Sequence, residues 1–327
     1  MLILTEADVR AVLEMRELID VMARALVQYS ARLVQQPLRT VLEIGPERAF
    51  FGVMPAYQPD PPALGTKLVT VFHGNAARGL PTHLATITLL DPETGRPLAL
   101  LDGRYITEAR TAAVSAASAR AMARPEASTL AILGSGVQAR SHLEALALVR
   151  ELREVRVYSP TREHRERFAR EAAGRLGGRT IVRAVESAAE AVRGADLIAL
   201  VTSSRAPVVE RSWIAEGAHI CAVGACRPDM REMDSALVVD ARLVVDSREA
   251  ALAEAGDIVI PMAEGRIGPD HIAGELGDVL AGRVAGRTSP REITLFKSLG
   301  LAIEDVAAAD LAYRRAVAAG LGRDVPL

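Results

Sequence analysis

TLAILGSGVQAR, residues 129–140, decides the fold of this chain. An apolar run leads directly into Gly134 and Gly136, Ala139 completes the spacing G-x-G-x-x-A, and a helical pattern follows. The first glycine permits a tight turn, the second lets the backbone approach a pyrophosphate, and the alanine allows close helix–strand packing. The N–H groups and the positive end of the helix would hold the phosphates. The pattern therefore predicts a nicotinamide-dinucleotide loop rather than a glycine turn without a ligand.

Apolar runs and helical patterns alternate from Pro125 onward. In chain order they are TLAIL, the helical 137–152, EVRVY, the helical 163–176, DLIALV and HICAV, then a strand candidate at 293–296 and a helical pattern over 301–319. Such alternation is typical of a parallel sheet with crossover helices.

The first 122 residues follow a different pattern. A helix is expected over 5–29, where Thr5 and Asp8 resemble a capped start, and another over 106–122. Between them lie β-prone runs, which favour an antiparallel or mixed sheet: LRTVLEI, AFFGVMPAY, TKLVTVF, HLATITLL and residues 98–101 after the turn-like DPETGRP. We expect the last helix to pack on this half. The predicted class is α/β, with a dinucleotide-binding domain over 123–299 and a discontinuous α+β domain over 1–122 and 300–327.

Composition excludes several classes of function. The 327 residues have a formal net charge of -2, and 50% are hydrophobic, which suits two domains and gives no basic field for nucleic acid or an anionic membrane. The start, MLILTEADVR, lacks the basic region of a secretory signal, and no apolar stretch has the length of a spanning helix. Cys221 and Cys226 are too few for a disulfide framework, and the histidines lack metal-ligand spacing. We expect a cytoplasmic protein with a small-molecule substrate and no catalytic metal.

The end of the second strand, EVRVY, bears on the choice of cofactor. An acid there would accept hydrogen bonds from the ribose 2′-hydroxyl of NAD. Here Ser159, Thr161 and Arg162 precede the first carboxylate, Glu163. Hydroxyl donors and a guanidinium suit a 2′-phosphate, so we predict NADPH as the preferred cofactor and NADH as the second choice. The alternative is that Arg162 is a solvated residue at a helix start, beside Glu163 and Glu166.

Three cations in the first half stand among apolar neighbours: Arg39 in LRTVLE, Lys67 in GTKLVT and Arg110 in TEARTAA. Burying a cation is costly unless it meets an anion, so one carboxylate-bearing ligand shared by all three would explain them. Three separate surface or salt-bridged residues are the alternative. A desolvated lysine beside two arginines would have a lowered pKa, which makes Lys67 a candidate proton donor or acceptor.

Nine segments occur in one order along most of the chain: LRTV, FFGVMPAY, TKLVTVF, PTHLAT, EARTAAVSA, ILGSGVQA, AVGACRPDMRE, VVDSREAAL and LFKSLGLAIED. Together they resemble the ornithine cyclodeaminase and mu-crystallin family, and most closely its mu-crystallin-like ketimine reductase branch. The resemblance implies a Rossmann domain plus a substrate-binding and dimerisation domain whose strands pair across a homodimer. It also implies that Arg39, Lys67 and Arg110, our candidate catalytic residues, bind the substrate carboxylate. The cofactor site that it implies contains Thr82, His83, Ser135, Val137, Gln138, Ser159, Thr161, Thr202, Ser203, Val223, Lys297 and Ser298, to which we add Thr111, Gly134, Gly136 and Arg162.

One departure from the family pattern bears on the chemistry. Ornithine cyclodeaminases have a catalytic aspartate in a G-G-D-C-P-G-K-T-E segment, and Cys226 of GACRPDMRE stands at that position here. Mu-crystallin-like members have a serine there, so the departure favours imine reduction over ammonia elimination. We expect Cys226 and His83 to contact the substrate, with Cys226 acting as a small residue rather than a nucleophile.

The resemblance and the cations together predict NAD(P)H-dependent reduction of a cyclic ketimine carboxylate to the L-amino acid, with Δ1-pyrroline-2-carboxylate or Δ1-piperideine-2-carboxylate as substrate. The rival enzymes are an L-amino-acid dehydrogenase of the alanine or arginine type and an ornithine cyclodeaminase. The alternative that is not an enzyme is a mu-crystallin-like protein that binds NADPH and a ligand with little turnover. Retention of all three cations weighs against that last alternative.

Overall fold

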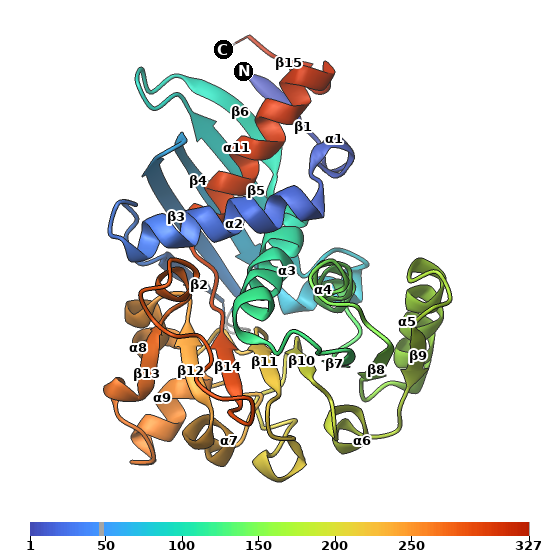
Figure 1. Ribbon diagram of the computed structural model, residues 1–327. Helices are drawn as coiled ribbons and strands as arrows, with labels where there is room; N and C mark the ends of the chain where they lie inside the picture. Colours follow the sequence, from blue (N-terminus) through green and yellow to red (C-terminus); the bar gives the residue numbers. More distant parts are fainter. Residues whose placement is uncertain (46–48, 327) are drawn as a thin grey trace. The chain divides into compact units, whose positions relative to one another are not determined.

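The computed structural model describes residues 1–45 and 49–326, which divide into two compact units (Figure 1). Unit 1 comprises Met1–Arg110 and Gly300–Leu327, and unit 2 comprises Thr111–Leu299. The division falls inside helix α3 (Gly103–Met122) rather than at its end, so residues 111–122 belong to unit 2.

Unit 1 contains a seven-stranded mixed sheet in the order β15-β1-β6-β5-β4-β3-β2. Only β1 and β6 pair in parallel among the described strands, and the other neighbours are antiparallel. Alternate residues of each long strand are buried, as a sheet with one covered face requires. The strands are β1 (Leu2–Leu4), β2 (Thr40–Ile44), β3 (Ala49–Pro59), β4 (Pro62–Val71), β5 (His83–Leu90), β6 (Pro97–Asp102) and β15 (Arg323–Asp324).

Helix α11 (Ala302–Ala319) packs against α2 (Met15–Ser30) and against β3, β4 and β5 (Figure 1). The single helix expected over 5–29 is wrong, because α1 (Glu6–Val12) ends before α2 begins. Leu13 and Met15 are both buried, and a continuous helix would point residues two apart to opposite sides. Thr5 does form the expected cap, a capping box with Asp8. The short η1 (His73–Arg78) links β4 to β5.

Unit 2 contains an eight-stranded parallel sheet in the order β13-β12-β14-β11-β10-β7-β8-β9, which confirms the predicted α/β class. Its strands are β7 (Thr129–Leu133), β8 (Glu154–Tyr158), β9 (Ile181–Ala184), β10 (Leu197–Leu200), β11 (His219–Ala222), β12 (Arg242–Val245), β13 (Ile272–Glu275) and β14 (Thr294–Lys297). Its remaining helices are α4 (Val137–Ala147), α5 (Arg162–Arg175), α6 (Ala188–Val192), η2 (Arg211–Trp213), α7 (Ser235–Asp240), α8 (Arg248–Glu254), α9 (Gly256–Ala263), η3 (Pro269–His271) and α10 (Leu276–Leu280).

The strand order of unit 2 reverses between β7 and β10. The chain adds β8 and β9 on one side of β7 and then returns to its other side with β10 and β11. In parallel sheets of this kind, ligands bind beyond the carboxyl ends of the strands at such a switch point. The fold therefore places the loops after β7 and β10 where a dinucleotide would bind.

Within residues 1–45 and 49–326, we find no helix that is both long and apolar enough to span a bilayer.

Candidate functional site

The glycine-rich loop follows β7 at the switch point of unit 2. Gly134 has φ +118°, and a Cβ there would lie 2.7 Å from the carbonyl oxygen of Val201, so the turn itself requires glycine. Gly136 is the N-cap of α4 with φ -82°, and a Cβ there would meet nothing within 4 Å. That open space adjoins Val137 and Gln138, whose N–H groups belong to the first turn of the helix. A cradle that a Cβ would fill, beside free helix donors, fits the pyrophosphate of a nicotinamide dinucleotide.

The end of β8 lies beside this loop. Ser135 Oγ donates a hydrogen bond to Ser159 Oγ at 3.0 Å, and Thr161 is the N-cap of α5. Arg162 is exposed, and its Nε lies 2.7 Å from Glu166 Oε1. The guanidinium predicted to meet a 2′-phosphate is therefore held by an acid one helical turn away.

Glu232 joins the ends of β10 and β11. It accepts hydrogen bonds of 2.7 Å from the backbone N–H and the hydroxyl of Thr202 and from the N–H of Gly224. The pKa of Glu232 is raised to about 7, first by burial and then by Asp257, while Lys297 and the hydrogen bonds from Thr202 oppose the shift. These contacts fix the loops that follow β10 and β11, where Ser203 is exposed and Val223 is buried.

Lys297, a residue predicted to line the cofactor, lies at the end of β14 in unit 2. Its side chain is buried, with Nζ 3.0 Å from Asp257 Oδ2, and the following Ser298 is buried too. Burial lowers the pKa of Lys297, but Asp257, Cys226 and Glu232 outweigh that effect and raise it. Cys226 is exposed and its thiol donates to the carbonyl of Val223 at 3.2 Å.

In unit 1 the structure brings together Arg39, Lys67 and Arg110, which we call the cation cluster. Lys67 Nζ lies 2.5 Å from Asp305 Oδ2, an ion pair between two buried side chains. Arg110 donates from Nε to Asp305 Oδ1 at 2.9 Å and from Nη1 to Glu304 Oε2 at 2.7 Å. Arg39 donates to the carbonyl of Gly300 at 3.0 Å.

Electrostatics in the cluster favour a charged carboxylate beside a lysine of low pKa. The pKa of Lys67 is lowered to about 8, chiefly by burial; Arg110 and Arg39 also lower it, and Asp305 opposes the shift. Burial alone would raise the pKa of Asp305, yet Arg110 and Lys67 bring it below its usual value. The sequence predicts this lowered lysine pKa, but it does not identify the acid.

His83 lies at the start of β5, in unit 1, with the exposed Thr82 before it. It points to the same face of the sheet as Lys67, because both residues are among the alternate positions of their strands that face the covered side. The pKa of His83 is lowered to about 4, first by burial and then by Lys67 and Arg110. The imidazole is therefore neutral at pH 7. Thr111, by contrast, is buried on α3 in unit 2.

Among the buried acids that sequence reasoning missed, four contact the residues described above: Glu232 and Asp257 in unit 2, and Glu304 and Asp305 in unit 1. For Glu304 and Asp305 the signal is the position of a carboxylate in an apolar run. Glu304 and Asp305 interrupt LGLAIEDVAAA, and both side chains are 0% exposed. Such acids are almost never buried unless paired.

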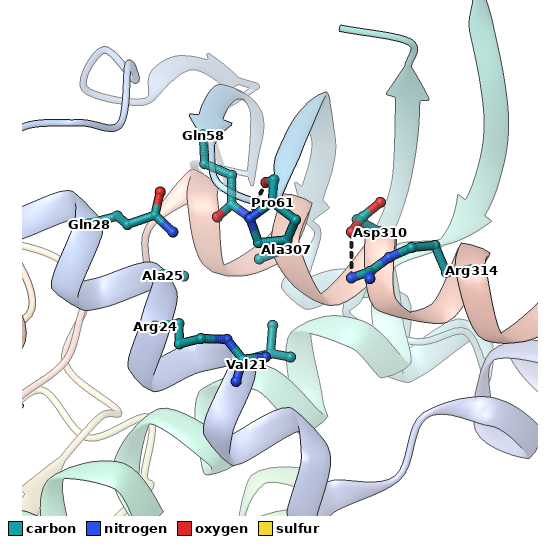
Figure 2. A pocket seen from close by; sticks show the side chains of 9 residues that line it. All are labelled: Val21, Arg24, Ala25, Gln28, Gln58, Pro61, Ala307, Asp310 and Arg314. Carbon is teal, nitrogen blue, oxygen red and sulfur yellow. Dashed lines mark hydrogen bonds and ion pairs between the residues drawn. The ribbon is translucent and has the colours of Figure 1, made fainter.

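A small cavity of unit 1 lies apart from this chemistry (Figure 2). It has about 10 Å³ between α2, α11 and the β3–β4 turn, and Gln28, Gln58 and Asp310 are among its lining side chains. No member of the cation cluster lines it. The space accommodates about one water molecule, too little for an amino acid or a dinucleotide.

The sequence and the fold are both similar to known proteins. The sequence matches the family model described as ornithine cyclodeaminase/mu-crystallin family over residues 1–320. It is similar to the ketimine reductase mu-crystallin of Mus musculus, with 45% identity over 280 residues that cover 86% of this chain and 85% of that protein.

Two solved structures are similar over nearly the whole chain. The first is Δ1-pyrroline-2-carboxylate reductase of Thermococcus litoralis in complex with NADH and L-proline, at 43% identity and TM-score 0.96, covering 99% of this chain and 100% of that one. The second is an archaeal alanine dehydrogenase dimer with bound NAD, at 36% identity and TM-score 0.92, covering 100% and 99%.

Proposed function

This chain belongs to the ornithine cyclodeaminase/mu-crystallin family, and from that membership we propose that it is an NAD(P)H-dependent reductase of cyclic ketimines that carry a carboxylate. Its substrates are Δ1-pyrroline-2-carboxylate or Δ1-piperideine-2-carboxylate, and its products are the cyclic L-amino acids. Two similar proteins whose names specify ketimine and pyrroline-2-carboxylate reduction support this activity. The observation that carries the proposal is the cation cluster around Asp305, which suits an anionic substrate.

The residues of the cation cluster have different tasks in this reaction. Arg39 and Arg110 orient the substrate carboxylate, because a planar guanidinium holds a carboxylate at two points. When bound, NAD(P)H supplies the hydride that the C=N carbon accepts. The electron pair of the C=N bond then moves to nitrogen, which takes a proton from the ammonium of Lys67 or from water. Neutral His83 adds no charge beside the lysine.

The dinucleotide site consists of the loop at Gly134 and Gly136, the end of β8 at Ser159, and the loops that Glu232 fixes after β10 and β11. We also propose a homodimer, for which the dimeric alanine dehydrogenase is support. A cytoplasmic location suits a reaction that consumes NAD(P)H, and it suits the two cysteines, Cys221 and Cys226, which form no disulfide within the described residues.

A panel of substrates tests the proposal. We expect cofactor oxidation with both cyclic imines at far higher kcat/KM than with pyruvate and ammonia. Activity with pyruvate and ammonia alone would instead identify an alanine dehydrogenase, a second candidate that the 36% identical alanine dehydrogenase favours. Ammonia release from L-ornithine would identify a cyclodeaminase. Binding of cofactor and L-proline without turnover of any substrate would identify a binding protein.

A further inference from the structure

The two carboxylates that open α11 differ in what they join. Asp305 places Oδ2 2.5 Å from Lys67 Nζ and Oδ1 2.9 Å from Arg110 Nε, so each oxygen meets one cation. Glu304 meets Arg110 at 2.7 Å. Lys67 belongs to β4 and Arg110 to α3, so Asp305 links two elements of unit 1 through their charged ends.

We propose that Asp305 is a positioning residue of the substrate site, which holds the ammonium of Lys67 and the guanidinium of Arg110 as one unit that receives the substrate carboxylate. This inference rests on the proposed function and deepens it. Two cations of different elements would repel each other and separate without a shared anion. Cations that are already fixed need no reorganisation when the carboxylate arrives, and this preorganisation is the usual source of electrostatic catalysis.

Asp305 also keeps the proton on Lys67. The charged or titratable groups that face this lysine are Asp305 on α11, Arg110 on α3, Arg39 before β2, and His83 on β5. Glu304 acts on it through Arg110, and the residue opposite on β3 is the uncharged Met54. Of the groups that shift the pKa of Lys67, Asp305 opposes burial and the arginines, so the ammonium present at pH 7 depends on it.

The substitution Asp305→Asn separates this role from simple attraction. Removing a negative charge beside the substrate carboxylate should strengthen its binding if Asp305 only adds to the local potential. If Asp305 positions and protonates Lys67, the same change weakens binding, and acid restores it by recharging the lysine. The two accounts therefore predict opposite signs and a different pH dependence.

The experiment uses the full-length protein loaded with NADH. Its calorimetric Kd for L-proline and its kcat/KM for Δ1-pyrroline-2-carboxylate are measured from pH 5.5 to 9. In the wild type we expect kcat/KM to fall above about pH 8, as Lys67 loses its proton. Asp305→Asn should lose roughly 10-fold or more in kcat/KM at pH 7.5 and move the fall to lower pH, so that most of the loss is recovered near pH 6.

The control is Glu304→Gln, an equally buried neighbour that also contacts Arg110. Glu304→Gln should lower kcat/KM without changing the pH above which kcat/KM falls, because the charge of Glu304 reaches Lys67 only through Arg110. Asp305→Glu keeps the negative charge but displaces it, so kcat/KM should decrease while the pH above which it falls stays near the wild-type value. If circular dichroism shows that Asp305→Asn does not fold, Asp305→Glu takes its place as the test variant.

The inference would be overturned if Asp305→Asn bound L-proline more tightly at every pH, or if its kcat/KM fell above the same pH as in the wild type. Full activity of Asp305→Glu would overturn it as well. A wild-type protein that neither reduces the ketimine nor binds L-proline would overturn the proposed function itself.

Discussion

Arg110 is as deeply buried as the apolar core, and its neighbours explain how a guanidinium remains there. It meets carboxylates of Glu304 and Asp305, both on α11. A Cβ at Gly300, where φ is +82°, would overlap the guanidinium, so this glycine provides the space. The shared anion that the sequence argument assigns to a ligand is thus supplied in part by the chain itself. We still expect the substrate carboxylate to add to it.

Replacing Arg110 should weaken the reaction in a way that depends on the substrate carboxylate. Losing a buried charged hydrogen bond costs about 2–4 kcal/mol, so Arg110→Ala should lower kcat/KM by roughly 30- to 1000-fold. Arg110→Lys keeps the charge and loses the fork, so its effect should be smaller. Both variants are assayed with a cyclic imine that has the carboxylate and with the same ring lacking it. An equal loss on both substrates, with cofactor affinity unchanged, would show that Arg110 is no carboxylate anchor.

The predicted preference for NADPH over NADH depends on Arg162. Arg162→Ala should raise KM for NADPH and leave KM for NADH unchanged, because only NADPH has the 2′-phosphate. Glu166 competes for the same guanidinium, so Glu166→Gln should increase the preference for NADPH. Steady-state kinetics with both cofactors measure this. If the wild-type kcat/KM for NADH equals or exceeds that for NADPH, the assignment of this strand end is wrong.

The sequence alone identified the buried cations of unit 1 but not the acids that pair with them. Arg39, Lys67 and Arg110 stand out because each charge interrupts an apolar run. Asp305 interrupts one as well, but an acid early in a helix is also typical of a solvated first turn. Which of the two holds depends on the packing of α11 against β4, a contact between residues more than 200 positions apart. Helical periodicity alone does not contain that information.

At the scale of elements, a substitution in the turn from β7 into α4 should affect cofactor binding without affecting folding. Gly136→Ala should fold normally, because its backbone suits any residue and the added methyl meets no protein atom within 4 Å. The methyl would occupy the space predicted for the pyrophosphate, so we expect the Kd for NADPH to rise by roughly 10-fold or more. Fluorescence titration and the thermal midpoint of the apoprotein measure the two effects.

Gly174 provides the matched control. It lies inside α5, and a Cβ there would also meet nothing within 4 Å. Gly174→Ala should stabilise the helix by about 0.5–1 kcal/mol and leave cofactor binding unchanged. Wild-type affinity for NADPH in Gly136→Ala would mean that the dinucleotide does not approach this position.

Elements with strong local patterns were predicted, and those shaped by tertiary contacts were not. The strands β7, β10 and β11 are short, largely buried runs with clear ends, typical of a buried parallel sheet, and β8 alternates buried and partly exposed residues. The interpretation missed β9, an edge strand with two exposed residues, and it missed β12 and β13 as well. The break between α1 and α2 contains no glycine or proline, and the buried Leu13 and Met15 flank it, so no local signal marks it.

At the scale of the whole molecule, one face of the unit 1 sheet presents apolar side chains to solvent. The edge strand β2 is exposed along its length, and its Leu42 begins a cross-strand row with Phe51, Thr70 and Leu84. Leu42, Leu68 and Leu84 are 58%, 36% and 43% exposed. Exposed edges and contiguous apolar surface are a liability that soluble proteins cover, and a second copy of the same chain would cover both.

We therefore expect a homodimer assembled through this face, and charge introduced there should dissociate it. The double variant Leu42→Glu, Leu84→Glu places like charges on the self-complementary surface of a two-fold interface, so each repulsion occurs twice. Light scattering at micromolar concentration should give a dimer for the wild type and a monomer for the variant, with unchanged circular dichroism. Val317→Glu is the control, because Val317 is 56% exposed on α11 and lies outside the sheet, and it should remain dimeric. A monomeric wild type, or a double variant that stays dimeric, would show that this face is not the interface.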